Sequence, residues 1–172
     1  MKDPRYPIGR FEPPASTGPE ERQTAIEVIR SFPLLLQELV SSVSGEDWKR
    51  TYRPGCWNVA QLVHHCADAN MNCFIRFKLA LSEDEPTVKP YRENAWTSQI
   101  DYNMELVQAS VEISRGVHAR WSALMENMTD EEWTRKFHHP EQKKSIPLTE
   151  ALFYYAWHCR HHLKHMEEAL KG

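Results

Sequence analysis

The sequence predicts an all-α protein folded as a four-helix bundle, with long connections between helices 2 and 3 and between helices 3 and 4. Two observations support this prediction. Apolar residues return at helical spacing through four long segments, and no two segments show the alternation expected of paired strands. The 172 residues suit a single domain, 1–172, in which residues 1–19, rich in Pro and Gly, form an N-terminal arm.

The first two helices have recognisable boundaries. The first is expected over residues 20–43, and Pro33 should kink it or split it in two. The second is expected over 59–81, because Asn58 is a good N-cap and Gln61 completes a pair resembling a capping box.

The second half of the chain alternates connections with helices. Residues 82–100 and 134–147 are interrupted by prolines and read as long irregular connections. A third helix is expected over 101–128 and a fourth over 149–170, with Thr149 as its N-cap. The residues expected on the buried side of the third helix are Leu106, Val107, Val111, Ile113, Val117, Trp121 and Leu124.

Composition excludes several classes of protein. The formal charge of −3 and the lack of a basic run argue against nucleic-acid binding. No apolar stretch approaches the roughly 20 residues that cross a bilayer, and the N-terminus lacks the apolar core of a signal peptide. We therefore expect a cytoplasmic protein that binds no membrane, with its four cysteines reduced and mostly buried.

The last helix carries four histidines in the string WHCRHHLKH. On a helical wheel, His158 and His162 lie at the margin of the apolar face, whereas His161 and His165 lie further from it. Two histidines at i and i+4 can hold one metal ion between them. The sequence therefore favours His158 and His162 over the other pair.

A third ligand should come from a facing helix. In the second helix, His65 lies nearer the apolar face, while His64 points about 100° away, toward the outside. Each histidine taken singly is most simply a hydrogen-bonded core or surface residue. Burying three imidazoles with nothing to bind is costly, however, so the set predicts a site for one divalent metal ion.

A polar line runs along the second helix beside His65. Asp68, Asn72 and Arg76 follow it at i+3, i+7 and i+11. The line could mark the boundary with solvent, or it could line a cleft. In the second case Asp68 is a candidate catalytic base or orienting group, and Arg76 is a candidate to hold a substrate carboxylate. His138 and His139 are expected on a solvated loop.

Four segments also carry a family resemblance: WNVAQLVHHCADANMNCFIRFKLALSEDEP, KPYRENAW, GVHARWSALMENMTDEEW and YYAWHCRHHLKH. Together with YPIGRFEP near the N-terminus they resemble the DinB/YfiT-like superfamily of metal-binding four-helix bundles, over nearly the whole chain. Carried over by position, that resemblance implies metal ligands at His65, His158 and His162. It also implies nickel or zinc, a homodimer and a cytoplasmic location. Ala69 and Asn70 depart from a Ser-His pair found in one member.

Three neutral imidazoles leave a coordination position open, which is typical of a catalytic site. The resemblance implies either a low-molecular-weight-thiol S-transferase of the bacillithiol type or a metal-dependent hydrolase. We favour the transferase, in which a bound thiol ionises at neutral pH and Arg76 grips its acidic part. In the hydrolase, activated water attacks the substrate and Asp68 is the base. A third alternative is a bundle that binds the metal without catalysis.

Overall fold

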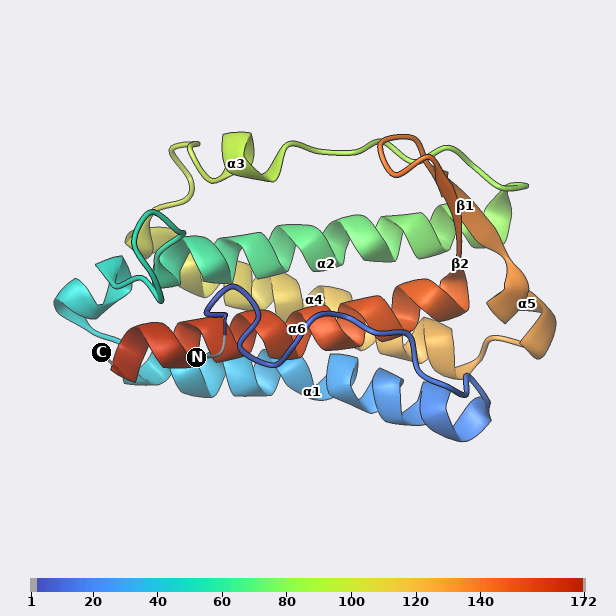
Figure 1. Cartoon of the computed structure of the whole chain (residues 1–172), viewed down its shortest axis with the longest axis horizontal. Coiled ribbons are helices and arrows are strands. Elements are labelled where there is room, and N and C mark those ends of the chain that lie inside the picture. The colour runs from blue at the N-terminus through green and yellow to red at the C-terminus, as the bar shows by residue number, and fades with distance from the viewer. Residues whose placement is uncertain (1–2, 172) are drawn as a thin grey trace.

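Four long helices dominate the structure, a computed structural model that describes residues 3–171. They are α1 (Pro19–Ser42), α2 (Val59–Ser82), α4 (Val107–Glu126) and α6 (Leu148–Lys171). Figure 1 shows them side by side along the long axis of the molecule. The predicted all-α four-helix bundle is confirmed.

The helices pack in an order that differs from their order in the chain. The main packing pairs are α1 with α4, α2 with α4, α1 with α6 and α2 with α6, so α1 and α2 occupy opposite corners of the bundle. Helices α2 and α4 run in the same direction (Figure 1). A 24-residue helix is about 36 Å long, so the chain must travel back over that length. This return path, which includes α3 (Glu93–Trp96) and the 3-10 turn η2 (Met104–Leu106), explains the long connection after α2.

Helix α1 contains Pro33 but runs unbroken, so of the two expected alternatives, a kink or a split, the split is wrong. A proline has no N–H to donate to the carbonyl four residues earlier, which here belongs to Ile29. That carbonyl instead accepts a hydrogen bond from Nδ1 of the buried His118 on α4, at 2.5 Å. A side chain from a neighbouring helix thus replaces the missing backbone bond.

The start of α2 is as predicted. The Asn58 side chain accepts from the Gln61 N–H at 2.9 Å, and the Gln61 side chain accepts from the Asn58 N–H at 3.0 Å. This capping box satisfies backbone donors that the first turn leaves free. A short 3-10 turn, η1 (Gly45–Lys49), separates α1 from this cap.

The connection before α6 is structured, contrary to the prediction of an irregular loop. It contains α5 (Asp130–Thr134) and two antiparallel strands, β1 (Lys136–His139) and β2 (Lys144–Pro147). Strands of four residues are too short for alternation to be visible in the sequence. The strand β1 also forms a parallel bridge with Thr87, which ties the first connection to the second.

Three details of α4 and α6 differ from expectation. The helix α4 begins at Val107 rather than near residue 101, and the expected core residues Leu106 and Ile113 are exposed. The helix α6 begins at Leu148, so Thr149 is not its N-cap; its hydroxyl donates to the Trp133 carbonyl instead.

The N-terminal arm, residues 3–18, lies across α6 (Figure 1). The Trp157 indole N–H donates to the Gly9 carbonyl at 3.3 Å, and the rings of Phe11 and Tyr154 contact edge to face. These contacts place the arm over the helix that carries four of the histidines. Within residues 3–171, no helix combines the length and the apolar character needed to cross a membrane. All four cysteines are free thiols, and three of them are buried.

Candidate metal centre

Three predicted ligands converge between α2 and α6. His65 comes from α2, and His158 and His162 come from successive turns of α6; all three are buried. Each offers a nitrogen within 4.8 Å of the other two. The structure therefore brings together the trio that the helical wheels favoured.

The geometry of the trio suits a metal ion. The Nε2 atoms of His65 and His158 lie 3.3 Å apart. Two nitrogens bound to one tetrahedral zinc ion are separated by about 3.3 Å. The opposite nitrogens of both rings, the Nδ1 atoms, have no hydrogen-bond partner among the described residues. With the protons on Nδ1, the two Nε2 lone pairs face each other, which is costly unless a ligand lies between them, so these residues fit a divalent ion.

Burial also keeps the trio in the form that binds metal. Desolvation lowers the pKa of His65 to about 4 and lowers the pKa values of His158 and His162 well below the usual 6.5. Neighbouring imidazoles lower the pKa values of His158 and His162 further. At neutral pH the three rings are therefore uncharged, with lone pairs free for a metal ion.

A second histidine group adjoins the first and shares His162 with it. His161, His162 and His165 are buried, and each offers a nitrogen within 4.8 Å of the others. The Nδ1 atoms of His162 and His165 are 3.4 Å apart, which suits a hydrogen bond that orients His162 with Nε2 free. A neutral imidazole has one nitrogen lone pair that can bind a metal ion. His162 in that form can therefore act as a ligand in only one of the two histidine groups at a time.

His64 is excluded as a ligand, as the sequence predicted, but it is buried rather than turned to the outside. Its Nε2 lies 2.8 Å from the Asn103 carbonyl and its Nδ1 lies 2.7 Å from the Ser110 hydroxyl. Because a carbonyl can only accept, Nε2 carries the proton and Nδ1 accepts from Ser110. Both nitrogens are therefore engaged by the protein.

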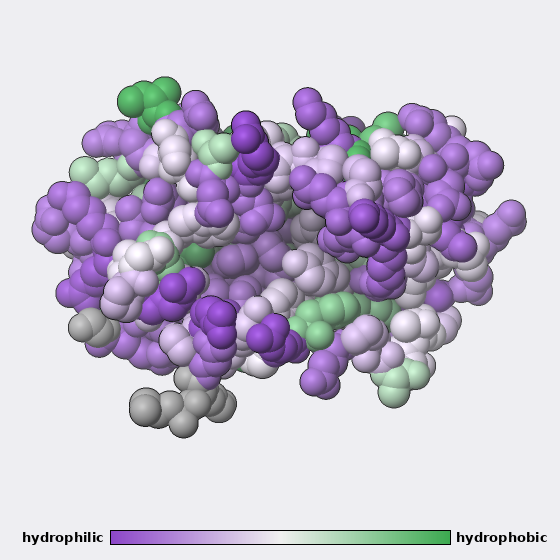
Figure 2. Space-filling view, turned by 45° about the horizontal axis from the view of Figure 1, so that its top comes forward, coloured by the Kyte–Doolittle hydropathy of each residue, from purple (hydrophilic) through white to green (hydrophobic). Residues whose placement is uncertain are grey.

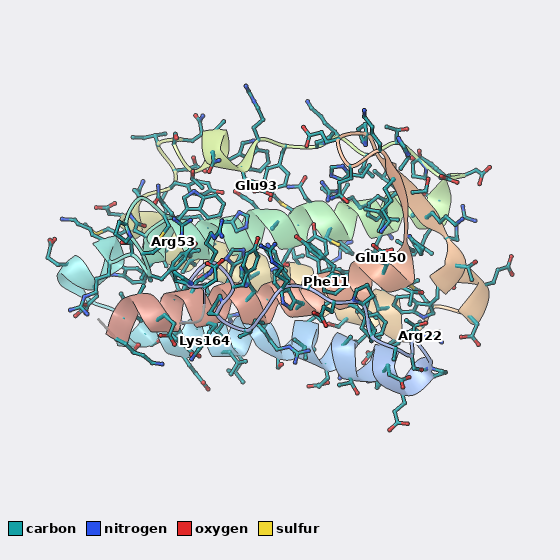
Figure 3. The ribbon with its side chains drawn as sticks, in the orientation of Figure 1. Phe11, Arg22, Arg53, Glu93, Glu150 and Lys164 are labelled. Atoms are coloured by element: carbon teal, nitrogen blue, oxygen red, sulfur yellow. The ribbon has the colours of Figure 1, made fainter. Side chains whose placement is uncertain are left out.

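A cavity of about 370 Å³ begins at His158 and extends between α2, α6, the strands and the connection after α2. Its polar lining includes Arg76, Tyr91, Glu93, His139, Tyr155 and His158. Figure 3 places Glu93 on the connection above α2, and it places Phe11 and Glu150, which also line the cavity, on the arm and near the start of α6. Figure 2 shows a mostly hydrophilic face with a recess near its middle. A volume of this size suits a small-molecule substrate.

The polar residues along α2 have different surroundings in the structure. Arg76 lines the cavity, whereas Asp68 accepts a hydrogen bond from Tyr102 and is not among the lining residues. Asn72 donates to the backbone carbonyl of Asp68. Half-burial raises the pKa of the Asp68 carboxyl, against the opposing effect of the Tyr102 hydrogen bond.

Several cavity residues were missed by sequence reasoning. His139 is buried on β1 and lines the cavity, so its assignment to a solvated loop is wrong. Tyr91 and Glu93 come from the connection after α2, where no periodicity indicates which side chains turn inward. Tyr155 alone carried a signal, since it lies one helical turn before His158 on the core face of α6.

Comparison with known proteins places these features in a family. The DinB superfamily profile matches residues 33–166. YfiT of Bacillus subtilis, provisionally named a metal-dependent hydrolase, is 39% identical over 163 residues, covering 95% of this chain and 92% of that protein. A relative from Geobacillus kaustophilus with a similar provisional name is 42% identical over 158 residues, covering 92% of this chain and 89% of the relative.

Comparison with solved structures agrees with these sequence matches. The structure of YfiT matches with a TM-score of 0.93 and 38% identity, covering 98% of this chain and 96% of that one. A mycothiol-dependent maleylpyruvate isomerase matches with a TM-score of 0.65 at 17% identity, covering 84% of this chain and 60% of that one, a likeness of fold alone. The profile match over most of the chain and the close relatives show that this chain belongs to the DinB superfamily.

Proposed function

We propose that the protein is a metal-dependent enzyme whose metal ion is held by His65, His158 and His162. The observation that carries the proposal is the convergence of three buried, uncharged imidazoles at one end of a cavity. Relatives from Bacillus subtilis and Halalkalibacterium halodurans carry provisional names as metal-dependent hydrolases, which supports an enzymatic role. A divalent ion with three imidazole ligands supplies a Lewis acid with an open position, at which a thiol or water becomes more acidic.

The reaction that we favour is S-transfer from a low-molecular-weight thiol of the bacillithiol type to an electrophilic small molecule. The thiol loses its proton to a base, its sulfur forms a bond to an electrophilic carbon, and the leaving group departs with the bonding electron pair. A mycothiol-dependent isomerase has the same fold, so thiol chemistry is compatible with this bundle. In this proposal Arg76 binds an acidic group of the thiol.

The alternative reaction is hydrolysis by activated water, with Asp68 as the proposed general base. The names of the relatives favour this alternative. The sequence of α6 argues against a close parallel with H-E-x-x-H hydrolases, because residues 159–161 are Cys, Arg and His, with no glutamate. A bundle that binds metal without catalysis is the third alternative.

A direct assay separates the two reactions. The metal-loaded protein is mixed with bacillithiol and a chromogenic electrophile, with glutathione and thiol-free mixtures as controls. We expect conjugation to depend on protein, metal and bacillithiol together. Conjugation no faster than without protein would reject the transferase for that thiol, and ester or amide hydrolysis that needs metal but no thiol would establish the alternative. Asp68→Asn should then lower the hydrolysis rate about 100-fold or more.

The identity of the ion and the assembly of the chain are further parts of the proposal. We propose nickel or zinc, one ion per chain, because imidazole suits both metals. Elemental analysis of protein prepared without chelators or affinity tags tests this stoichiometry. We also propose a cytoplasmic homodimer, for which light scattering should give twice the 20.2 kDa mass of the chain.

A further inference from the structure

Arg76 is a buried cation without a carboxylate partner. The residue is only 8% exposed, yet it lines the cavity. Among the described residues it forms no ion pair, and its one hydrogen bond runs from Nη1 to the Tyr155 hydroxyl at 3.3 Å. A guanidinium is always charged and has five N–H donors. Most of those donors are therefore free for an acceptor that enters the cavity.

Glu93 provides the opposite charge in the same cavity. Glu93 is an exposed residue that lines the cavity, and its carboxylate forms no ion pair with any described residue. Burial raises the pKa of Glu93 and the charge of Arg76 lowers it, although no hydrogen bond or ion pair joins the two side chains. The cavity lining thus includes a cation and an anion that are not paired with each other.

The charges of the other ionisable residues that line the cavity restrict which ligands fit. Glu150 is neutralised by an ion pair with Lys144. Burial, with help from the charge of Arg76, lowers the pKa of His139, so that ring is uncharged at neutral pH. Glu141 adds a second negative charge. A ligand with only carboxylates would be repelled by Glu93 and Glu141, and a ligand with only amines would leave Arg76 without a partner.

We infer that the cavity binds a zwitterionic small molecule. Its carboxylate pairs with the Arg76 guanidinium in the planar two-bond geometry that arginine favours. Its ammonium lies toward Glu93, and its reactive group points to His158 and the metal centre. The inference rests on the proposed function in one respect, because the ligand is taken to be the substrate or cosubstrate of that centre.

Three small thiols test the charge pattern. L-cysteine carries both a carboxylate and an ammonium group, 3-mercaptopropionate carries only the carboxylate, and cysteamine carries only the ammonium group. Calorimetric titration of the zinc-loaded protein measures the Kd of each. We expect L-cysteine to bind about tenfold or more tightly than either of the others, since each charged hydrogen bond that is lost weakens binding by about that factor.

Two variants assign each charge to its residue. Arg76→Met should weaken L-cysteine and 3-mercaptopropionate about tenfold or more and leave cysteamine within twofold. Glu93→Gln should weaken L-cysteine and cysteamine and leave 3-mercaptopropionate within twofold or tighter. Melting temperature and zinc content check that each variant is folded and loaded. If Arg76→Met does not fold, Glu93→Gln and the wild-type comparison still decide.

Equal affinity for the three thiols, or equal weakening of all three by a variant, would overturn the inference. The outcome is independent of the proposed reaction. Charge-selective binding without turnover would reject the proposed function and keep the zwitterion site. Conjugation or hydrolysis without charge-selective binding would support the proposed function and reject the zwitterion site.

Discussion

At the scale of single residues, the metal centre depends on which nitrogen of each ring is free. His65 and His158 approach each other through Nε2, and the contact between His162 and His165 involves their Nδ1 atoms. For His162, the partner on Nδ1 fixes the tautomer and aims Nε2 at the proposed metal position, whereas the Nδ1 atoms of His65 and His158 have no partner among the described residues. The same rule excludes His64, whose two nitrogens both bind the protein.

Replacing a ligand should remove the metal. His158→Ala leaves two imidazoles, so we expect less than about a tenth of the wild-type metal content after dialysis. The control is His138→Ala on β1, which should keep its metal. Circular dichroism then separates the roles of the ion: a folded, metal-free and inactive His158→Ala protein supports the enzyme, and an unfolded one supports a structural metal.

Replacing the orienting residue should weaken the metal site without abolishing it. We expect His165→Ala to reduce zinc affinity about 10- to 100-fold, the usual cost of losing a partner behind a metal-bound histidine. His165→Gln retains a side-chain acceptor and should recover part of the loss. Competition with a chromophoric chelator gives both affinities, and an affinity unchanged in His165→Ala would show that His162 is oriented by other contacts.

At the scale of secondary-structure elements, missing backbone hydrogen bonds are supplied by side chains. The capping box of Asn58 and Gln61 starts α2 six residues before His65. In α1, His118 donates to the carbonyl that Pro33 leaves without its helical partner. Both devices keep a helix regular where its own backbone cannot.

The cap makes a measurable contribution to stability. Asn58→Ala should lower the free energy of unfolding by about 1 kcal/mol, because a backbone N–H of the first turn loses its acceptor. Asn58→Asp keeps an acceptor at the same place and should stay close to the wild type. Urea unfolding of metal-free protein measures the three values, and equal stability of Asn58→Ala and wild type would contradict the assignment.

At the scale of the whole molecule, the bundle buries an unusual number of imidazoles, and this makes its stability sensitive to acid. His118 shows the effect away from the metal centre, since burial lowers its pKa to about 4 against the opposing hydrogen bond to Ile29. Its ordinary value is 6.5. Between these pH values the unfolded chain takes up a proton that the folded chain does not. The contribution of His118 to stability is therefore present above pH 6.5 and is lost as the pH falls toward 4.

This difference predicts the pH dependence of unfolding. Metal-free protein should lose about 2 kcal/mol between pH 7 and pH 5 through His118 alone. His118→Gln can still donate to the Ile29 carbonyl but does not titrate, so its loss over the same interval should be smaller by about that amount. Urea unfolding at the two pH values measures both, and parallel pH profiles would show that His118 does not carry the effect.

Local periodicity and capping chemistry were sufficient to predict the four helices and to choose three histidines that the fold brings together. Four amphipathic segments, the cap at Asn58 and the wheel positions of His65, His158 and His162 depend on residues a few positions apart. Such local patterns can be recognised without any knowledge of tertiary contacts. The proposed metal ligands could be selected because each lies on a regular helix, where spacing determines direction.

The tertiary structure alone decided what depends on contacts between distant segments. It brought Glu93 and His139 into the cavity with Arg76, paired the short strands β1 and β2, and joined His118 to the Ile29 carbonyl. It also buried His64 against α4 through Ser110. Apart from the two strands, which are neighbours in the chain, these partners lie far apart in the sequence, and irregular connections carry no periodicity that fixes side-chain direction. The proposed metal ligands could therefore be identified from helical spacing, whereas the cavity beside them forms only when the connections pack over the bundle.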